Sequence, residues 1–311
     1  MDRRMISPSA FRRRFPVVAI LAVCCLASPA PAAGASTAQS ASSNGTDSFV
    51  WPRSVDEIVP PVTPGIACPL AEVLRGAAQR VKDLATDLEE FTATEHIEHR
   101  ELERGGRWGA PRSRSFEYLV ALREPRPGWL AIEESRDRSL ALSSFPTNMA
   151  TTGVVAFALI FHPSYTGDFR MSCEGLGNRQ GQPAWQVRFE QRADRPARIF
   201  SFRVGDTPYP VRLKGRAWIA ADTFHVVRME TDMMEPISAL RLKGEHLAID
   251  YQPVQFKKES VVVWLPEKVE VFLDFRGLRF QHRHTFSDYM LFSVRVRHVV
   301  ADPVPPSAPP P

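Results

Sequence analysis

The sequence lacks an excess of charge of either sign once its first 35 residues are set aside. The whole chain has 39 Lys and Arg against 35 Asp and Glu, and residues 1–35 hold five of the arginines and a single acid, which leaves 34 of each sign. A nucleic-acid-binding domain concentrates basic residues on one face. We therefore expect no nucleic-acid partner.

Short motifs of common catalytic sites are also absent. The chain has no G-x-S-x-G elbow for a serine nucleophile and no C-x-x-C pair for redox chemistry. The adjacent carboxylates Glu133 and Glu134 would point apart on a strand, and Glu89 and Glu90 would face water at a helix end, so neither pair forms an acid–base dyad. We expect no catalytic residue and no cofactor.

Four histidines raise the alternative of a metal site. His96 and His99 would point to opposite faces of a strand, whereas His282 and His284 share one face. With His96, or with a carboxylate such as Glu95 or Asp288, the second pair could form a tetrahedral zinc site. Two such histidines in a strand rich in basic residues usually face solvent. We therefore expect no metal and keep a metal-dependent hydrolase as the second alternative function.

Residues 1–35 have the composition of an export signal. Arginines precede the apolar run FPVVAILAVCCLA, and Ala30-Pro31-Ala32 supplies a small-residue cleavage site. The run is shorter than the roughly 20 residues that a bilayer span requires. We expect cleavage of this signal, no transmembrane segment in the mature chain, and export to the periplasm or cell envelope.

Two of the four cysteines lie in that signal, and Cys68 and Cys173 remain. Cysteine pairs in an oxidising compartment tend to be bridged, so we predict a disulfide between them. Its loop of about a hundred residues would stabilise the fold by roughly 4–5 kcal/mol in the chain-entropy model. Two unpaired buried thiols are the alternative.

Composition divides the chain into four parts. The signal is followed by residues 36–50, which are mostly small and polar and form a disordered linker. Residues 51–299 contain no second linker and predict a single β-rich domain with a substantial core. Residues 300–311 are rich in proline and predict a disordered tail.

The predicted domain opens with an amphipathic helix and continues with strands. In PLAEVLRGAAQRVKDLATDLEEF the apolar residues recur every three or four positions, and Pro69 suits the first helical position. From Phe91 the period changes to two, which is typical of an antiparallel sheet with one buried face. The strand candidates are 91–103, 114–123, 129–136, 169–173, 184–191, 199–204, 210–220, 224–233, 240–252, 259–265, 267–275 and 278–297.

One segment, GVVAFALIF at residues 153–161, is apolar on all sides and ends before Pro163. It is too short to span a membrane. Either a short buried helix or a central strand would account for it. The helical alternative would lie across the mouth of a curved sheet.

The order of these elements resembles the LolA/LolB/RseB-like group of periplasmic lipoprotein-carrier folds. The helix ends with Leu84, Leu88 and Phe91, long antiparallel strands follow, and the hairpin GRAWIAADTFHVVRMETD resembles a G-x-x-W-I-D pattern with Ala220 in place of the acid. The resemblance covers residues 68–297. It implies an α+β, mainly antiparallel fold, in which a curved and incompletely closed β-barrel wraps round the amphipathic helix and the short apolar helix.

The same resemblance implies a lipid or lipoprotein acyl chain as ligand, held without catalysis in an apolar cavity. The residues that we predict to line it are Phe157, Ile160, Phe161, Trp185, Trp218 and Phe272. Each of these side chains would fill an ordinary core equally well. A packed envelope scaffold, with a protein partner and no small ligand, is therefore the first alternative function.

Overall fold

The computed structural model describes residues 51–88, 90–126, 129–136, 153–204, 207–256 and 262–292. All of them fall within one compact unit, Thr46–Pro311. The predicted signal, linker and proline-rich tail lie outside the described residues. In the part of the chain that is described, no helix combines the length and apolar character needed to cross a bilayer.

The amphipathic helix is confirmed as α1, Leu70–Asp87. Its apolar stripe packs against the sheet, and Val73, Ala77 and Val81 are almost completely buried. The helix begins directly after Pro69, as predicted. The stripe therefore holds one side of the helix on the core and leaves its charged side toward solvent.

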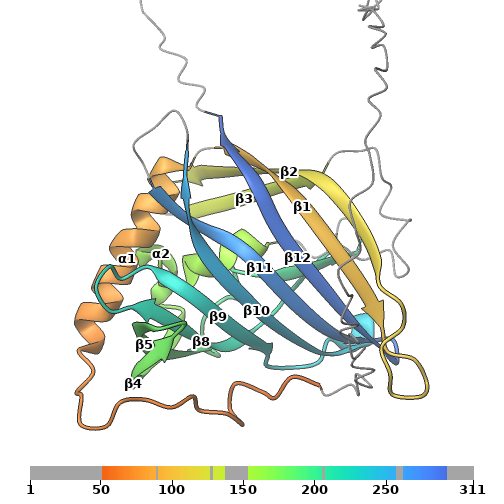
Figure 1. The fold of residues 1–311 in the computed structure, drawn as a ribbon, viewed down its shortest axis with the longest axis horizontal. Coiled ribbons are helices and arrows are strands. Elements are labelled where there is room, and N and C mark those ends of the chain that lie inside the picture. The colour runs from red at the N-terminus through yellow and green to blue at the C-terminus, as the bar shows by residue number, and fades with distance from the viewer. Residues whose placement is uncertain are drawn as a thin grey trace, which may run out of the picture. The chain divides into compact units, whose positions relative to one another are not determined.

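The strands form one large antiparallel sheet, which confirms the predicted fold class. Its ten strands follow the order β3-β2-β1-β12-β11-β10-β9-β8-β5-β4, and β3 and β4 are not paired with each other, so the curved sheet stays open (Figure 1). The bounds are β1 Glu90–Glu101, β2 Arg112–Arg126, β3 Trp129–Arg136, β4 Phe169–Arg179, β5 Gln182–Gln191, β8 Leu213–Ala220, β9 Val226–Met233, β10 Leu242–Gln255, β11 Val262–Phe275 and β12 Leu278–Leu291. A separate hairpin pairs β6, Ser201–Val204, with β7, Thr207–Pro210.

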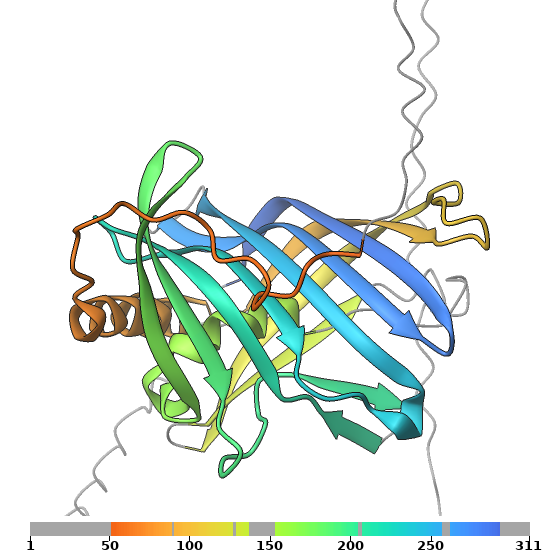
Figure 2. The same ribbon diagram turned by 90° about the horizontal axis from the view of Figure 1, so that it is seen from below.

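The apolar segment is a 3₁₀ helix, η2, Val154–Phe161, and all eight of its residues are buried. The sheet curves round it, as Figure 2 shows. Phe157 packs against Phe200 with ring centroids 5.3 Å apart, and Phe161 meets Phe189 edge to face at 6.3 Å. The helical alternative is therefore the one that the structure adopts. A short helix, α2, Pro163–Thr166, follows, and a 3₁₀ turn, η3, Ser238–Leu240, precedes β10.

Two predicted strands, 259–265 and 267–275, form the single strand β11, which passes through Pro266. The register between β10 and β11 shifts where Tyr251 pairs with Pro266 and Asp250 pairs with Lys268. Such an irregularity leaves a position without a ladder hydrogen bond, which proline tolerates. The prediction was wrong here because it treated the proline as the end of a strand.

The segment before α1, residues 51–67, crosses the outer face of the sheet and is called the strap below (Figure 2). The fully buried guanidinium of Arg216 holds it, donating to the carbonyl oxygens of Val55 and Ile58 at 3.0 and 2.9 Å and pairing with Glu174. Asp56 adds ion pairs with Arg188 and Lys214. The strap therefore covers polar side chains that would otherwise form an exposed outer surface.

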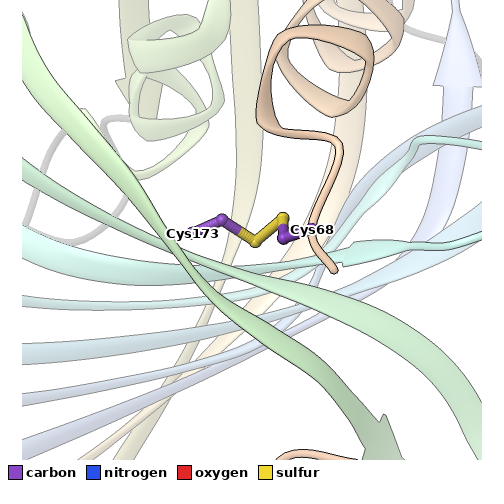
Figure 3. The surroundings of a disulfide bond; sticks show 2 residues. All are labelled: Cys68 and Cys173. Carbon is purple, nitrogen blue, oxygen red and sulfur yellow. A yellow bond between two sulfur atoms is a disulfide. The ribbon is translucent and has the colours of Figure 1, made fainter. Parts of the chain in front are cut away.

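A disulfide joins Cys68, at the end of the strap, to Cys173 on β4 (Figure 3). This confirms the predicted pairing. Next to it, the amide of Thr63 donates to the carbonyl of Leu176 at 2.7 Å. The strap is thus tied to an edge strand of the sheet both covalently and through a backbone hydrogen bond.

The tip of the β8–β9 hairpin lies against α1. A Cβ atom at Gly76 would come within 2.4 Å of Cγ of Phe224, so the helix can approach the hairpin this closely only with glycine. Arg80 Nε also donates to the carbonyl of Thr223 at 2.8 Å. This close approach fixes the distance between α1 and the start of β9.

Replacing Gly76 by Ala is expected to lower the free energy of unfolding by about 1–3 kcal/mol, the usual cost of overpacking. In an unobstructed helix the same change would instead stabilise by up to about 1 kcal/mol. Urea denaturation measures the difference. Gly105→Ala, where no atom lies within 4 Å of the new Cβ, is the control. Stabilisation by Gly76→Ala would contradict the close approach.

Candidate functional site

A cleft of ≈ 170 Å³ lies between the C-terminal half of α1 and the adjoining ends of β9, β10 and β11. Val81 and Leu84 of α1 form one wall, and the β11 residues Val262, Val263 and Trp264 are also among the lining residues. Ala158 of η2 reaches the cleft as well. Apolar side chains from helix, sheet and interior segment therefore meet at one opening.

Polar groups enter this cleft at a few points. The hydroxyl of Tyr251 is buried and has no hydrogen-bond partner among the described residues, and burial raises the pKa of this phenol. Nδ1 of His225 also lacks a partner there, and its ring stacks on Trp264 at 5.2 Å. Burial, helped by the charge of Arg80, lowers the pKa of His225 to about 4. The histidine is therefore neutral near pH 7.

Four of the predicted lining residues lie in the main hydrophobic core. Phe157, Ile160 and Phe161 are completely or almost completely buried in η2, and Trp185 on β5 belongs to the same core. None of these four residues lines the cleft of α1. Their contact with a ligand stays a prediction, and the structure gives all four a packing role.

Trp218 and Phe272 are placed on the outer face of the sheet, away from the expected interior. Trp218 is buried there beneath Arg228, whose guanidinium carbon lies 5.7 Å from the ring centroid. Phe272 packs against Trp51 of the strap with ring centroids 6.4 Å apart. Their neighbours along each strand face the core, and successive side chains alternate between faces. The strap therefore covers Phe272, and Arg228 covers Trp218.

A second group of polar residues is buried on the inner face of β1, β3 and β12. Glu95 has no exposed surface; it accepts two hydrogen bonds from Arg136, one of them 2.7 Å long, and pairs with Nδ1 of His284 at 2.8 Å. Burial alone would raise the pKa of Glu95, but the hydrogen bonds from His284 and Arg136 outweigh it and hold the pKa below its ordinary value. This carboxylate is therefore charged and fully paired.

His282 and His284 do share a face, but they are buried, which corrects the expectation that they face solvent. The ring of His282 lies 4.9 Å from that of His99, which is also buried, and 6.3 Å from that of His284. His96 points away from them and pairs with Ser115 at 3.0 Å. Across the described ranges, no group of three or more His, Cys, Asp and Glu is arranged to hold a metal ion.

Glu245 on β10 is a buried acid of a different kind. It is 5% exposed, and neither carboxyl oxygen has a hydrogen-bond partner within the described part of the chain. Burial raises its pKa to about 8. The carboxyl group is therefore mostly protonated at neutral pH, unlike Glu95.

The sequence reasoning missed Tyr251, His225 and Glu245. Tyr251 stands in phase with Leu247 and Ile249, whose inward positions the period of two already indicated. His225 directly follows the hairpin turn. The polarity pattern alone could have placed Tyr251 inside, but it could not show that its hydroxyl would lack a partner.

Comparisons with known proteins give likenesses in fold. No family model matches the chain, and no curated protein matches it. A DUF1329 family protein from Desulfovibrio piger covers 72% of this chain and 94% of its own at 10% identity with a TM-score of 0.42. A LolA superfamily protein from Nitrosomonas europaea covers 73% and 96% at 12% identity, TM-score 0.35. An outer membrane lipoprotein-sorting protein domain from Vibrio parahaemolyticus covers 70% and 93% at 9% identity, TM-score 0.35.

The LolA superfamily protein is thus among the chains to which this one is similar, at a low TM-score. These likenesses concern the fold alone.

Replacing Glu245 by Gln is expected to stabilise the protein increasingly as pH rises from about 4.5 to 8. Across this range the folded state keeps a proton that the unfolded state releases, so wild-type stability falls as pH rises. The advantage of the variant should grow by about 3 kcal/mol between pH 5 and pH 8. Urea denaturation at both pH values measures it, with exposed Glu133→Gln as the control. Parallel pH profiles for Glu245→Gln and wild type would contradict the buried acid.

Replacing His99 by Phe is expected to reduce the loss of stability in acid. Burial, with Arg112 nearby, lowers the pKa of His99 to about 4, so below about pH 6.5 the unfolded state binds a proton that the folded state does not. Wild type should therefore lose about 2 kcal/mol more than His99→Phe between pH 7 and pH 4.5. The same denaturation series measures this, with His96→Phe as the control. Equal losses would show that His99 is not buried in its neutral form.

Proposed function

We propose that this is a non-catalytic cell-envelope protein that binds a hydrophobic ligand, and that the cleft beside α1 admits the ligand. The candidates are a lipid or the acyl chain of a lipidated partner. The observation that supports this is an opening at which apolar side chains of α1, η2 and β11 meet, beside the polar residues Arg80, Asp83, His225 and Tyr251. The apolar part of this surface gains stability when an apolar molecule covers it.

The size of the cleft limits how much of a ligand it holds. Typical small-molecule pockets are about 300–1,000 Å³, whereas this cleft is ≈ 170 Å³. Each buried CH₂ group contributes about 0.8 kcal/mol, so the end of a chain would bind only weakly. A longer ligand would have to displace η2, which separates the cleft from the core through Ala158.

The first alternative, a packed scaffold module that binds a protein partner, has its own support. All eight residues of η2 are buried, and Phe157 and Phe161 pack against the rings of Phe200 and Phe189. In that case the cleft would be a surface feature without a ligand. For the second alternative, a metal-dependent hydrolase, the described residues offer no group of three or more metal ligands.

Native mass spectrometry with organic extraction distinguishes the ligand-binding protein from the packed scaffold. It is carried out on mature protein purified from a periplasm without detergent. A co-purifying hydrophobic molecule at near one-to-one would support the binder. If the measured mass is that of the protein alone and added fatty acid does not bind, the packed scaffold is the function supported.

Val262 provides the variant that tests the location of binding. It is 49% exposed at the cleft, so Val262→Asp should not destabilise the fold. A charge there must be desolvated under an apolar ligand, so we expect affinity for a fatty acid carrying a fluorescence quencher to fall at least tenfold. Quenching of tryptophan fluorescence measures binding. Val204→Asp, on exposed β6, is the control, and equal affinities of both variants would place binding elsewhere.

A further inference from the structure

Two residues of opposite charge line the cleft beside α1. Arg80 and Asp83 lie three positions apart on the helix and are followed by the apolar Leu84, so the three side chains share one helix face. Arg80 is exposed and Asp83 is half-buried, whereas Ala158, which lines the cleft from the side of the core, is 5% exposed. A molecule in the cleft therefore meets apolar side chains inside and both charges at the rim.

The two charges are held apart from each other. Opposite charges three positions apart on a helix commonly form a pair. Here Nε of Arg80 donates to the carbonyl of Thr223 at 2.8 Å, and Oδ1 of Asp83 accepts from the side chain of Gln79 at 2.6 Å. Within the described ranges, neither charge has an ion-pair partner. The terminal nitrogens of Arg80 and the second oxygen of Asp83 are thus left for a ligand.

The other polar residues at the cleft add no charge. Burial, helped by Arg80, lowers the pKa of His225 to about 4, while Asp222 and Asp83 act in the opposite direction, so the histidine is neutral near pH 7. The hydroxyl of Tyr251 is buried, so a ligand meets only the rest of that side chain. Asp222 does not line the cleft. Among the lining residues, the charges are therefore one positive and one negative.

A ligand with a single charge would be repelled by one of these two residues. An anion placed on Arg80 would lie near Asp83, and an ammonium placed on Asp83 would lie near Arg80. Like charges brought together in a complex weaken it. A head group that carries both signs gives each residue a partner, and a guanidinium matches the geometry of phosphate oxygens.

The volume of the cleft limits the apolar part of the ligand. At ≈ 170 Å³ the cleft is similar to an engineered cavity of about 150 Å³ in another protein that binds benzene, which corresponds to about six carbon atoms. The part of an acyl chain next to its head group would fill this space. A longer chain would continue over the exposed Val262 or displace η2.

We propose that the cleft binds a lipid whose head group carries a phosphate and an ammonium, with the phosphate on Arg80 and the ammonium on Asp83. The proposal rests on the proposed function, because it uses the same cleft, and it names the class of lipid. The phosphate accepts hydrogen bonds from the terminal nitrogens of Arg80, and the ammonium donates to the carboxylate of Asp83. The carbons next to the head group lie against Leu84 and Trp264.

Three probes with the same hexanoylglycerol body test this on the mature protein. Hexanoylglycerol itself is uncharged, its phosphoglycerol derivative adds a phosphate, and its phosphoethanolamine derivative adds a phosphate and an ammonium. NMR titration measures the three affinities. Because ion pairs near solvent are weak, we expect the phosphoethanolamine probe to bind about threefold to fivefold more tightly than the phosphoglycerol probe.

Substitutions of the two charged residues should change these affinities differently. Asp83→Asn keeps the oxygen that accepts from Gln79 but removes the charge, so the difference between the two phosphate probes should disappear. Arg80→Gln should weaken binding of both phosphate probes about threefold and leave hexanoylglycerol unchanged. Glu72→Gln and Arg75→Gln, at exposed positions of α1 outside the cleft, are the matched controls and should change none of the affinities.

The outcomes separate this proposal from the proposed function. Equal affinities for the three probes, weakened in Val262→Asp, would overturn recognition of the head group and leave hydrophobic binding in place. No binding of any probe or of fatty acid would overturn both. A preference for the phosphoethanolamine probe that persists in Asp83→Asn would overturn the role of that carboxylate. Equal weakening of all three probes in Arg80→Gln would show that Arg80 only holds the hairpin through Thr223, which would overturn its contact with phosphate.

Discussion

The open edge of the ten-stranded sheet is the constraint on which the rest of the structure depends. A closed barrel would bury its inner face by itself, but here β3 and β4 are not joined, and the concave apolar face must be covered by other segments. η2 supplies eight buried apolar residues for this purpose, and α1 supplies its stripe. The cleft lies where helix, 3₁₀ segment and sheet meet, which is a place that a closed barrel would not contain.

Because the sheet is open, it has two edge strands that could pair with other chains. A different set of contacts protects each edge. At β3, the hydroxyl of Tyr165 donates to the carbonyl of Leu130 and accepts from its amide, so a side chain takes the place of a neighbouring strand. At β4, the Thr63 amide and the disulfide of Cys173 hold the strap along the edge. Both the Tyr165 hydroxyl and the strap engage backbone groups that would otherwise favour edge-to-edge association.

Much of this fold could be predicted from the sequence because its signals are local. The stripe of α1 and the period of two along the strands follow from which side chains must be buried. The disulfide was predicted from the oxidising compartment and from the two cysteines that remain outside the signal. The side of the sheet on which Phe272 lies could not be predicted, because the strap covers this residue and only tertiary contacts show where the strap crosses. Trp218 lies beneath Arg228, a contact that the period of two does not show either. The continuation of β11 through Pro266 could not be predicted for a similar reason. A proline fits within this strand because the register with the neighbouring strand shifts there.

The buried polar groups differ in a way that bears on function. Glu95 lies between Arg136 and His284 with its charge paired, so its cost of burial is offset inside the described structure. Tyr251 has no such compensation: it lines the cleft, but its hydroxyl is buried and has no partner among the described residues. The carboxyl group of Glu245 also lacks a partner, and it lines no described cleft. Its raised pKa means that the group is buried in its neutral, protonated form. An unpaired buried polar group therefore does not by itself mark a binding site, because a ligand must also be able to reach the polar atom.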